Sequence, residues 1–197
     1  MIGLSEPDGA SFIADRLIDR FGSVPAILSA SPADRADATA NAPHVGKMLD
    51  VVRRIMLHAL RHEASSGPII SNHDALLAYL QVAMAHEPRE QLRALFLNAR
   101  NELLSEELIL EGSVRFVRMH PREILHRALS AGATAVVIVH NHPSGDPRPS
   151  ARDVEATRAL IEAAAPLDIV IHDHLVIARF GVVSLRASGL LDAAGEC

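Results

Sequence analysis

The stretch ATAVVIVHNHPSGDPRPSARD, residues 133–153, determines the fold that this sequence predicts. Its first seven residues are apolar and rich in β-branched side chains, which is typical of a buried strand in the middle of a sheet. Three prolines and one glycine follow within residues 140–149, so the chain leaves the strand through a stiff, sharply turned loop. Ser150 then begins a helix that we expect to continue to about Ala164. A buried strand, a loop and a helix in this order indicate an α/β fold.

Short strands and one more helix surround this stretch in the sequence. Apolar runs separated by polar turns predict the strands, and Pro121 suits the first position of a helix that ends near Gly132. Polar residues 99–102 supply the turn between the first two strands. The predicted fold class is therefore α/β, with a mixed β-sheet flanked by helices. The predicted strands cover residues 92–97, 108–110, 114–117, 133–139, 168–171, 175–177 and 182–185.

The first third of the chain is predicted to be helical. Apolar residues recur there at the spacing of an amphipathic helix. Residues 29–43 are rich in Ala, Asp, Ser and Pro, which favours a loop or a weak helix. We expect a small all-helical N-terminal region at residues 1–70 and an α/β domain at residues 71–197. The predicted helices before the first strand cover residues 10–20, 24–29, 45–62 and 73–85.

Composition excludes several classes of protein. The chain has 197 residues, 49% of them hydrophobic and 22% charged, which is ordinary usage for a folded globular protein. The single cysteine, Cys197, excludes a disulfide scaffold and a zinc site built from several thiolates. The longest aliphatic run, residues 133–139, is too short to span a bilayer, and the first residues do not resemble a signal peptide. We therefore expect a cytoplasmic protein without a membrane partner.

The charge balance does not favour nucleic-acid binding. The chain carries 19 Lys and Arg against 24 Asp and Glu, a formal net charge of −5, and neither half is basic. Binding to a phosphate backbone depends on dense positive charge. Histidine is the unusual residue type, with 11 copies, and the placement of two of them carries the functional prediction.

His140 and His142 lie two residues apart at the end of the predicted buried strand. Side chains at this spacing in an extended chain point to the same side, so the two imidazoles can converge on one ion. The loop can return Asp153, in the first turn of the next helix, to the same place. Two imidazoles and one carboxylate leave the fourth position of a tetrahedral zinc for water, which is the pattern of a catalytic site. Ser150 and Asp153 also fit a helix capping box, and the two interpretations are compatible.

The sequence at this point resembles a known family. His140, His142, Ser150 and Asp153 match the spacing of the metal-binding signature of JAMM/MPN metalloprotease-like domains. The wider string HNHPSGDPRPSARD resembles bacterial RadC proteins, which have long been labelled DNA-repair proteins. HPREILHRAL at 120–129 and DHLVI at 173–177 are similar to that family at the expected places, and the similarity runs from about Pro88 to Leu191.

The resemblance implies roles for individual residues. In JAMM domains the two histidines and the aspartate bind zinc, and the serine helps to stabilise the oxyanion, which carries over to His140, His142, Asp153 and Ser150. A glutamate on an early strand acts as general base and acid. Glu90 fits that position best, with Glu87 and Glu123 as the alternatives. The implied protein is a zinc-dependent hydrolase of amide or isopeptide bonds in a JAMM/MPN-like fold.

Two other functions remain open at this stage. Residues 14–31 resemble the helical segment that precedes the metal domain in RadC proteins, where a helix-hairpin-helix grips DNA phosphates. The corresponding turn here, NAPHVGK at 41–47, has one glycine, so the motif is degraded. The first rival function is a DNA-associated repair module whose metal serves DNA chemistry or structure. The second is a non-catalytic interaction domain. The sequence does not predict an oligomeric state.

Four more polar residues have two interpretations each. His172 and His174 form a second His-x-His pair, which either binds metal or takes part in structural hydrogen bonds, and we favour the second. Asn141 and Ser144 either line the metal site or satisfy backbone groups of the loop.

Overall fold

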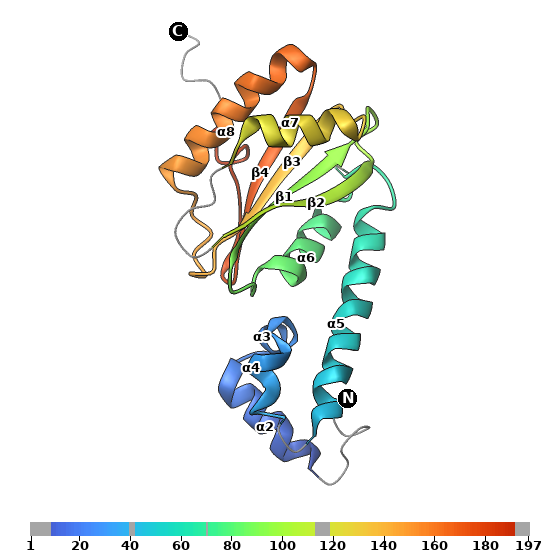
Figure 1. Ribbon diagram of the computed structural model, residues 1–197, viewed down its shortest axis with the longest axis vertical. Coiled ribbons are helices and arrows are strands. Elements are labelled where there is room, and N and C mark those ends of the chain that lie inside the picture. The colour runs from blue at the N-terminus through green and yellow to red at the C-terminus, as the bar shows by residue number, and fades with distance from the viewer. Residues whose placement is uncertain (1–8, 40–41, 70, 113–118, 192–197) are drawn as a thin grey trace. The chain divides into compact units, whose positions relative to one another are not determined.

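The computed structural model describes residues 9–39, 42–69, 71–112 and 119–191. The chain forms two compact units, residues 1–61 and 62–197. The predicted fold class is confirmed: a mixed sheet of five strands is flanked by helices and preceded by a helical region (Figure 1).

The first unit is built from helices. These are α2 (Ala10–Phe21), α3 (Val24–Ser29), α4 (Pro32–Ala36) and the greater part of α5 (Pro43–Ala64). The short α4 falls in the stretch expected to be a loop or weak helix, and Ser31 caps it by accepting a hydrogen bond from the backbone of Asp34. The apolar faces of the helices close a small core formed by Ile13, Leu17, Ile27, Leu28, Ala38, Ala42, Val45 and Leu49.

The second unit contains the sheet, with strand order β2-β1-β3-β4-β5. β3 lies in the middle and pairs antiparallel with β1 and parallel with β4, while β2 and β5 are antiparallel edge strands. All seven residues of β3 are buried, as the apolar run predicts. The strands are β1 (Glu90–Leu97), β2 (Leu103–Gly112), β3 (Ala135–Asn141), β4 (Val170–Ala178) and β5 (Gly181–Ser184).

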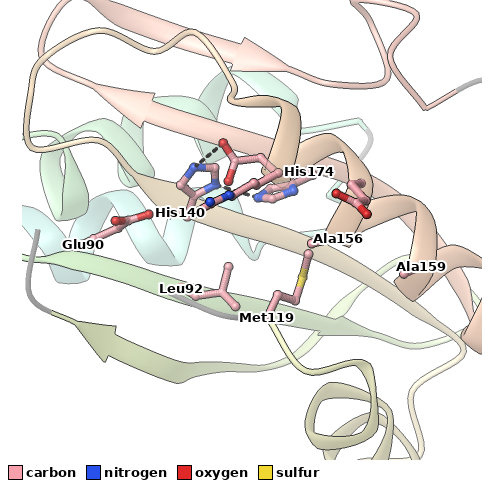
Figure 2. Close-up of a pocket in the computed structure, with 10 residues that line it drawn as sticks. Glu90, Leu92, Met119, His140, Ala156, Ala159 and His174 are labelled. Atoms are coloured by element: carbon pink, nitrogen blue, oxygen red, sulfur yellow. Dashed lines mark hydrogen bonds and ion pairs between the residues drawn. The ribbon is translucent and has the colours of Figure 1, made fainter. Parts of the chain in front are cut away.

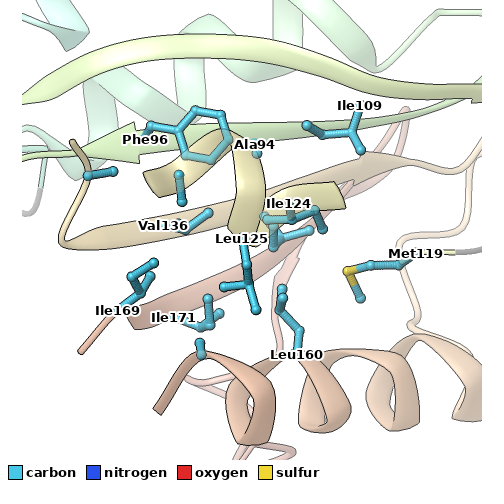
Figure 3. Close-up of a cluster of buried hydrophobic side chains, with 14 of the residues drawn as sticks. Ala94, Phe96, Ile109, Met119, Ile124, Leu125, Val136, Leu160, Ile169 and Ile171 are labelled. Carbon is cyan, nitrogen blue, oxygen red and sulfur yellow. The ribbon is translucent and has the colours of Figure 1, made fainter. Parts of the chain in front are cut away.

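Helices cover both faces of this sheet (Figure 1). Helix α6 (His73–Met84) lies on one face, and α7 (Pro121–Ser130) and α8 (Ala151–Ala164) lie on the other. A short 3-10 helix (Ala165–Leu167) follows α8. Alternate residues of β1 and β3 point toward α7 and α8 and form the main core, which includes Ala94, Phe96, Val136, Ile138, Ile124, Leu125 and Leu160 (Figure 3). This face also carries the site described below.

The strands differ from the prediction in their bounds and in one junction; β3, for example, begins and ends two residues later than expected. β1 begins at Glu90, and β2 begins at Leu103, five residues before its predicted start, because its polar residues lie on an edge strand where solvent accepts them. The two strands predicted at 168–171 and 175–177 are one strand, β4, with a bulge at His172. The strand predicted at 114–117 lies outside the described residues. Among the helices that the structure describes, none has the length and apolar character needed to cross a bilayer.

Candidate metal centre

The predicted ligands come together where β3 ends and α8 begins. Figure 2 shows Glu90, His140 and His174 at this place. β1 runs antiparallel to β3 with Leu92 opposite His140, so the first residue of β1, Glu90, lies beside the end of β3. The loop after β3 returns the chain to the same edge, where Asp153 occupies the first turn of α8. Three elements that are separate in sequence thus supply one cluster.

The two histidines converge through the same ring atom. His140 Nε2 lies 2.9 Å from His142 Nε2. Asp153 Oδ2 lies 3.7 Å from the first of these nitrogens and 3.8 Å from the second. Glu90, His140 and His142 each offer a ligand atom within 4.8 Å of the others. The structure therefore brings together four of the five predicted site residues as possible ligands, and Ser150 adjoins them through Asp153.

A hydrogen bond at the far side of His142 determines which of its ring nitrogens faces the cluster without a proton. His142 Nδ1 lies 2.8 Å from the carbonyl oxygen of Asp146, and a carbonyl only accepts, so Nδ1 carries the proton. In the neutral ring, Nε2 then presents a lone pair to His140 Nε2 and Asp153. Nitrogen lone pairs and a carboxylate directed into one small space are the donor set that zinc binds.

Burial keeps the key histidine in the form that binds metal. His140 is buried, and this burial lowers its pKa to about 4, with the nearby Asp153 carboxylate opposing the shift and His142 adding to it. Its ring is therefore neutral near pH 7, and only a neutral imidazole has a lone pair for a metal.

Glu90 has the environment expected of a proton-transfer group. Partial burial raises the pKa of its carboxyl above the ordinary value, His142 opposes this shift and Asp153 adds to it. Raised carboxyl pKa values near a metal or substrate pocket are typical of general acids and bases.

The two alternative carboxylates lie elsewhere. Glu123 forms an ion pair with Arg127 one turn later on α7, at 2.7 Å. Glu87 contributes its backbone carbonyl to Asn141. Glu90, unlike these two, lines the pocket beside His140. The role of Glu90 as general base stays a prediction.

Ser150 and Asp153 form a complete capping box. Ser150 Oγ accepts from the backbone N–H of Asp153 at 3.2 Å, and Asp153 Oδ2 accepts from the backbone N–H of Ser150 at 2.6 Å and from its hydroxyl at 2.7 Å. The same Oδ2 is the atom that faces the two histidines. The cap and the metal-facing arrangement are thus both present, as the sequence allowed.

Asn141, between the two histidines, holds the start of β1. Its side-chain oxygen accepts from the backbone N–H of Gln91 at 2.8 Å, and its amide nitrogen donates to the carbonyls of Arg89 and Glu87 at 3.0 and 3.3 Å. These contacts lie on both sides of Glu90 in the sequence, so Asn141 orients the backbone that carries this carboxylate. Asn141 thus satisfies backbone groups, as one of the two interpretations held, but these belong to the start of β1 and not to the loop that follows His142.

The loop after His142 is braced from the β4–β5 turn. Gly145 has φ +92, and a Cβ there would lie 2.9 Å from the ring of Phe180. The Phe180 N–H donates to the Gly145 carbonyl, and Ser144 Oγ accepts from the backbone of Asp146. Ser144 therefore also serves the loop backbone, and the close approach of the ring requires glycine at position 145.

The second His-x-His pair does not converge. His172 Nε2 lies 2.6 Å from Asn101 Oδ1, whereas His174 Nε2 lies 2.7 Å from His140 Nδ1. The bulge at His172 separates them, because Val136 pairs with Ile171 and Val137 with Asp173. The favoured interpretation, structural hydrogen bonds, agrees with these contacts, but nothing in the sequence indicated that His174 contacts a predicted metal ligand.

Thr157 is a further site residue that sequence reasoning missed. It is fully buried on α8, one turn after Asp153, and its Oγ1 lies 2.6 Å from His174 Nδ1. The available signal was weak: a threonine four residues after Asp153 on the same helix face.

A pocket of about 500 Å³ opens beside the cluster (Figure 2). Glu90, His140, Asp153 and His174 contribute polar groups to its lining. Apolar side chains continue it between β1 and α8, and Arg152 and Glu155 add charge. The apolar lining residues are Leu92, Met119, Ala156 and Ala159.

Two comparisons relate this chain to known proteins. A sequence profile described as the RadC-like JAB domain matches residues 69–190. A UPF0758 protein from Rhodobacter capsulatus is 42% identical over 179 residues, which cover 91% of this chain and 84% of that protein.

Proposed function

The chain belongs to the RadC-like JAB domain family, and on that premise we propose that it is a zinc-dependent hydrolase that cleaves amide or isopeptide bonds. The observation that carries this proposal is the convergence of His140 Nε2, His142 Nε2 and Asp153 Oδ2 next to Glu90 at the edge of a pocket. A capping box alone would not require two imidazoles at this place.

His140, His142 and Asp153 would hold the ion. Each presents an atom of the kind that zinc prefers, and one face of the cluster opens to the pocket. When bound, zinc supplies a Lewis acid that polarises a carbonyl oxygen and makes water a nucleophile near neutral pH.

Glu90 is the residue to which we assign proton transfer. Its raised pKa favours a carboxylate that takes a proton from the attacking water and delivers it to the leaving amine. Asn141 keeps this carboxylate in place through the backbone on both sides of it. Ser150 is the residue that we assign to the developing oxyanion. Its one hydroxyl proton goes to Asp153 Oδ2 in this structure and would turn to the oxyanion during the reaction.

The pocket supports a peptide as the substrate class. Leu92, Met119 and the two alanines of α8 offer apolar contacts, and Arg152 and Glu155 offer charged ones. A peptide chain presents both kinds of group, so we propose peptides or isopeptide-linked peptides as the first substrates to examine.

The test is zinc content followed by hydrolysis. Elemental mass spectrometry on the tag-free full chain is expected to find one zinc per chain, and the loaded protein is expected to cleave members of a peptide and isopeptide library. Glu90→Gln should keep the zinc and lose cleavage by a factor of about 100 or more. Glu162→Gln, on the exposed side of α8, is the matched control and should keep both.

Each failure has a distinct meaning. Protein without zinc, even after incubation with it, would contradict the metal site and favour an interaction domain. Protein that holds zinc, cleaves no peptide and binds branched or single-stranded DNA in a salt-dependent way would favour the DNA-associated rival. Full activity of Glu90→Gln would move the general base to another carboxylate.

A further inference from the structure

We propose that His174, oriented by Thr157, is a positioning residue that keeps the proton of His140 on Nδ1 and so leaves Nε2 free to bind metal. This inference rests on the metal site of the proposed function. It is carried by a row of three short contacts that runs from α8 through β4 to β3: Asp153 carbonyl, Thr157 hydroxyl, His174 ring and His140 ring.

The direction of the hydrogen bonds is set at Thr157. Its Oγ1 lies 2.6 Å from the backbone carbonyl of Asp153 and 2.6 Å from His174 Nδ1. A hydroxyl has one proton to donate, and a carbonyl oxygen only accepts. The Thr157 proton therefore goes to Asp153, and Oγ1 accepts from His174. The opposite assignment would hold two acceptor oxygens 2.6 Å apart with no proton between them.

His174 transmits this direction to His140. With its proton on Nδ1, the neutral His174 ring has a lone pair on Nε2, which lies 2.7 Å from His140 Nδ1. His174 is fully buried, which disfavours a second proton on its ring. His140 Nδ1 must then be the donor, and His140 Nε2 is left without a proton.

On the metal side, His140 Nε2 presents a lone pair to His142 Nε2, and two nitrogens this close need a proton or a cation between them. His140 Nε2 and His142 Nε2 lie 2.9 Å apart, and the proton of His142 is held on Nδ1 by the Asp146 carbonyl. Each ligand histidine is thus oriented from behind, one by a backbone carbonyl and one by a second histidine. Such outer hydrogen bonds set the tautomer of metal-binding histidines and raise their basicity.

The bulge in β4 makes this arrangement possible. Ile171 faces the α8 side of the sheet together with its partner Val136. In a regular strand His174, three residues later, would face the opposite side. The extra residue at His172 reverses the alternation, so that His174 pairs with Ile138 and shares the face of His140. The bulge therefore aims His174 at the ligand.

The experiment measures tautomers and zinc affinity in the full chain. Long-range ¹H–¹⁵N spectra of the metal-free protein are expected to show His140 and His174 with a proton on Nδ1 and none on Nε2. Zinc affinity, measured by competition with a chromophoric chelator, is expected to fall by about 10- to 100-fold in His174→Leu. Thr157→Val should weaken zinc binding in the same direction, and Thr157→Ser, which keeps the hydroxyl, should restore it to within about twofold of the wild type.

His172→Gln is the matched control, because it changes the neighbouring histidine and keeps a donor for Asn101. It should leave zinc affinity unchanged. The proposal is overturned if His140 carries its proton on Nε2 in the wild-type protein, or if Thr157→Val and Thr157→Ser bind zinc equally well. Because the tautomers are read without metal, they test this inference even if the wild type binds no zinc, an outcome that would contradict the proposed function instead.

Discussion

Two His-x-His pairs lie on neighbouring parallel strands of the same sheet, and they behave differently. In the first, His140 and His142 point the same way and their Nε2 atoms meet at 2.9 Å. In the second, a bulge sends His172 to Asn101 and His174 to the back of His140. Identical spacing therefore predicts convergence only where the strand keeps a regular pleat.

The central residues of the two pairs, Asn141 and Asp173, also have different hydrogen-bond partners. Asn141 reaches across to β1 and holds the backbone around Glu90. Asp173 serves its own strand and the next one, by accepting from the backbone of His174 and from Ser184. The first pair thus contributes directly to the candidate metal centre. The second contacts His140 on the side away from the centre and connects β4 to β5. Substitutions at the two pairs should therefore have unequal effects.

The largest expected effect is on zinc binding by the first pair. His142→Ala removes one of the two converging nitrogens, so zinc measured by elemental mass spectrometry should fall from one per chain to a trace. His172→Ala is the equivalent change in the second pair and should keep the zinc. Equal zinc content in the two variants would contradict the distinction between the pairs.

Acid should lower the stability of the folded protein through the buried histidine of each pair, His140 and His174. Burial lowers the pKa of His140 to about 4 and that of His174 well below its ordinary value, so between pH 6.5 and 4 the unfolded chain binds protons that the folded chain does not. Stability of the metal-free protein should therefore fall as the pH falls, by up to about 1.4 kcal/mol per pH unit for each group.

Urea unfolding at pH 7, 6 and 5 measures this dependence. His140→Gln should have a shallower slope, because one of the two groups is gone. An unfolding free energy that stays constant from pH 7 to pH 5 would show that these rings do not stay neutral in the folded protein.

Asn141→Ala should cost less than the loss of a ligand in metal binding, yet it should be clearly visible in stability. The change leaves the buried N–H of Gln91 without its partner and removes the part-buried bond to the carbonyl of Arg89. We expect a loss of about 1–3 kcal/mol in the free energy of unfolding by urea. Cleavage should fall further than zinc content, because the backbone of Glu90 is released; a proportional fall in both would argue against this positioning role.

The smallest change in stability is expected for a substitution at His172. Glutamine can donate to Asn101 as the imidazole does, so His172→Gln should change the free energy of unfolding by less than about 0.5 kcal/mol. Thermal unfolding compared with the wild type is sufficient to check this. A large loss would mean that the ring itself maintains the bulge.

The features that could be predicted from the sequence are those formed by residues close together along the chain. The buried strand, the loop and the helix start at Ser150 all lie within 21 consecutive residues, and local periodicity and loop chemistry were sufficient for the two histidines and Asp153. Glu90 is 50 residues away from His140, and the resemblance to a family, not spacing, selected it. The sheet register then explains its position, because Leu92 pairs with His140.

The roles of Asn141, Thr157 and His174 could not be predicted in this way. Each depends on a partner in another element, and for His174 the strand alternation itself is altered by one extra residue. The polar run of residues 172–174 was interpreted as a break between two strands for the same reason. A bulge satisfies such polar residues inside a continuous strand, which a pattern of apolar residues does not reveal.

Asp153 Oδ2 serves two structures with one atom, since it closes the cap of α8 and faces the two histidines. Any ion held there binds only the conformation in which the first turn of α8 is closed. By linkage, a bound ion therefore lowers the population of molecules in which that turn is open. Amide hydrogen exchange in the first turn of α8 should therefore be slower when an ion is bound, so it measures occupancy of the site without a substrate.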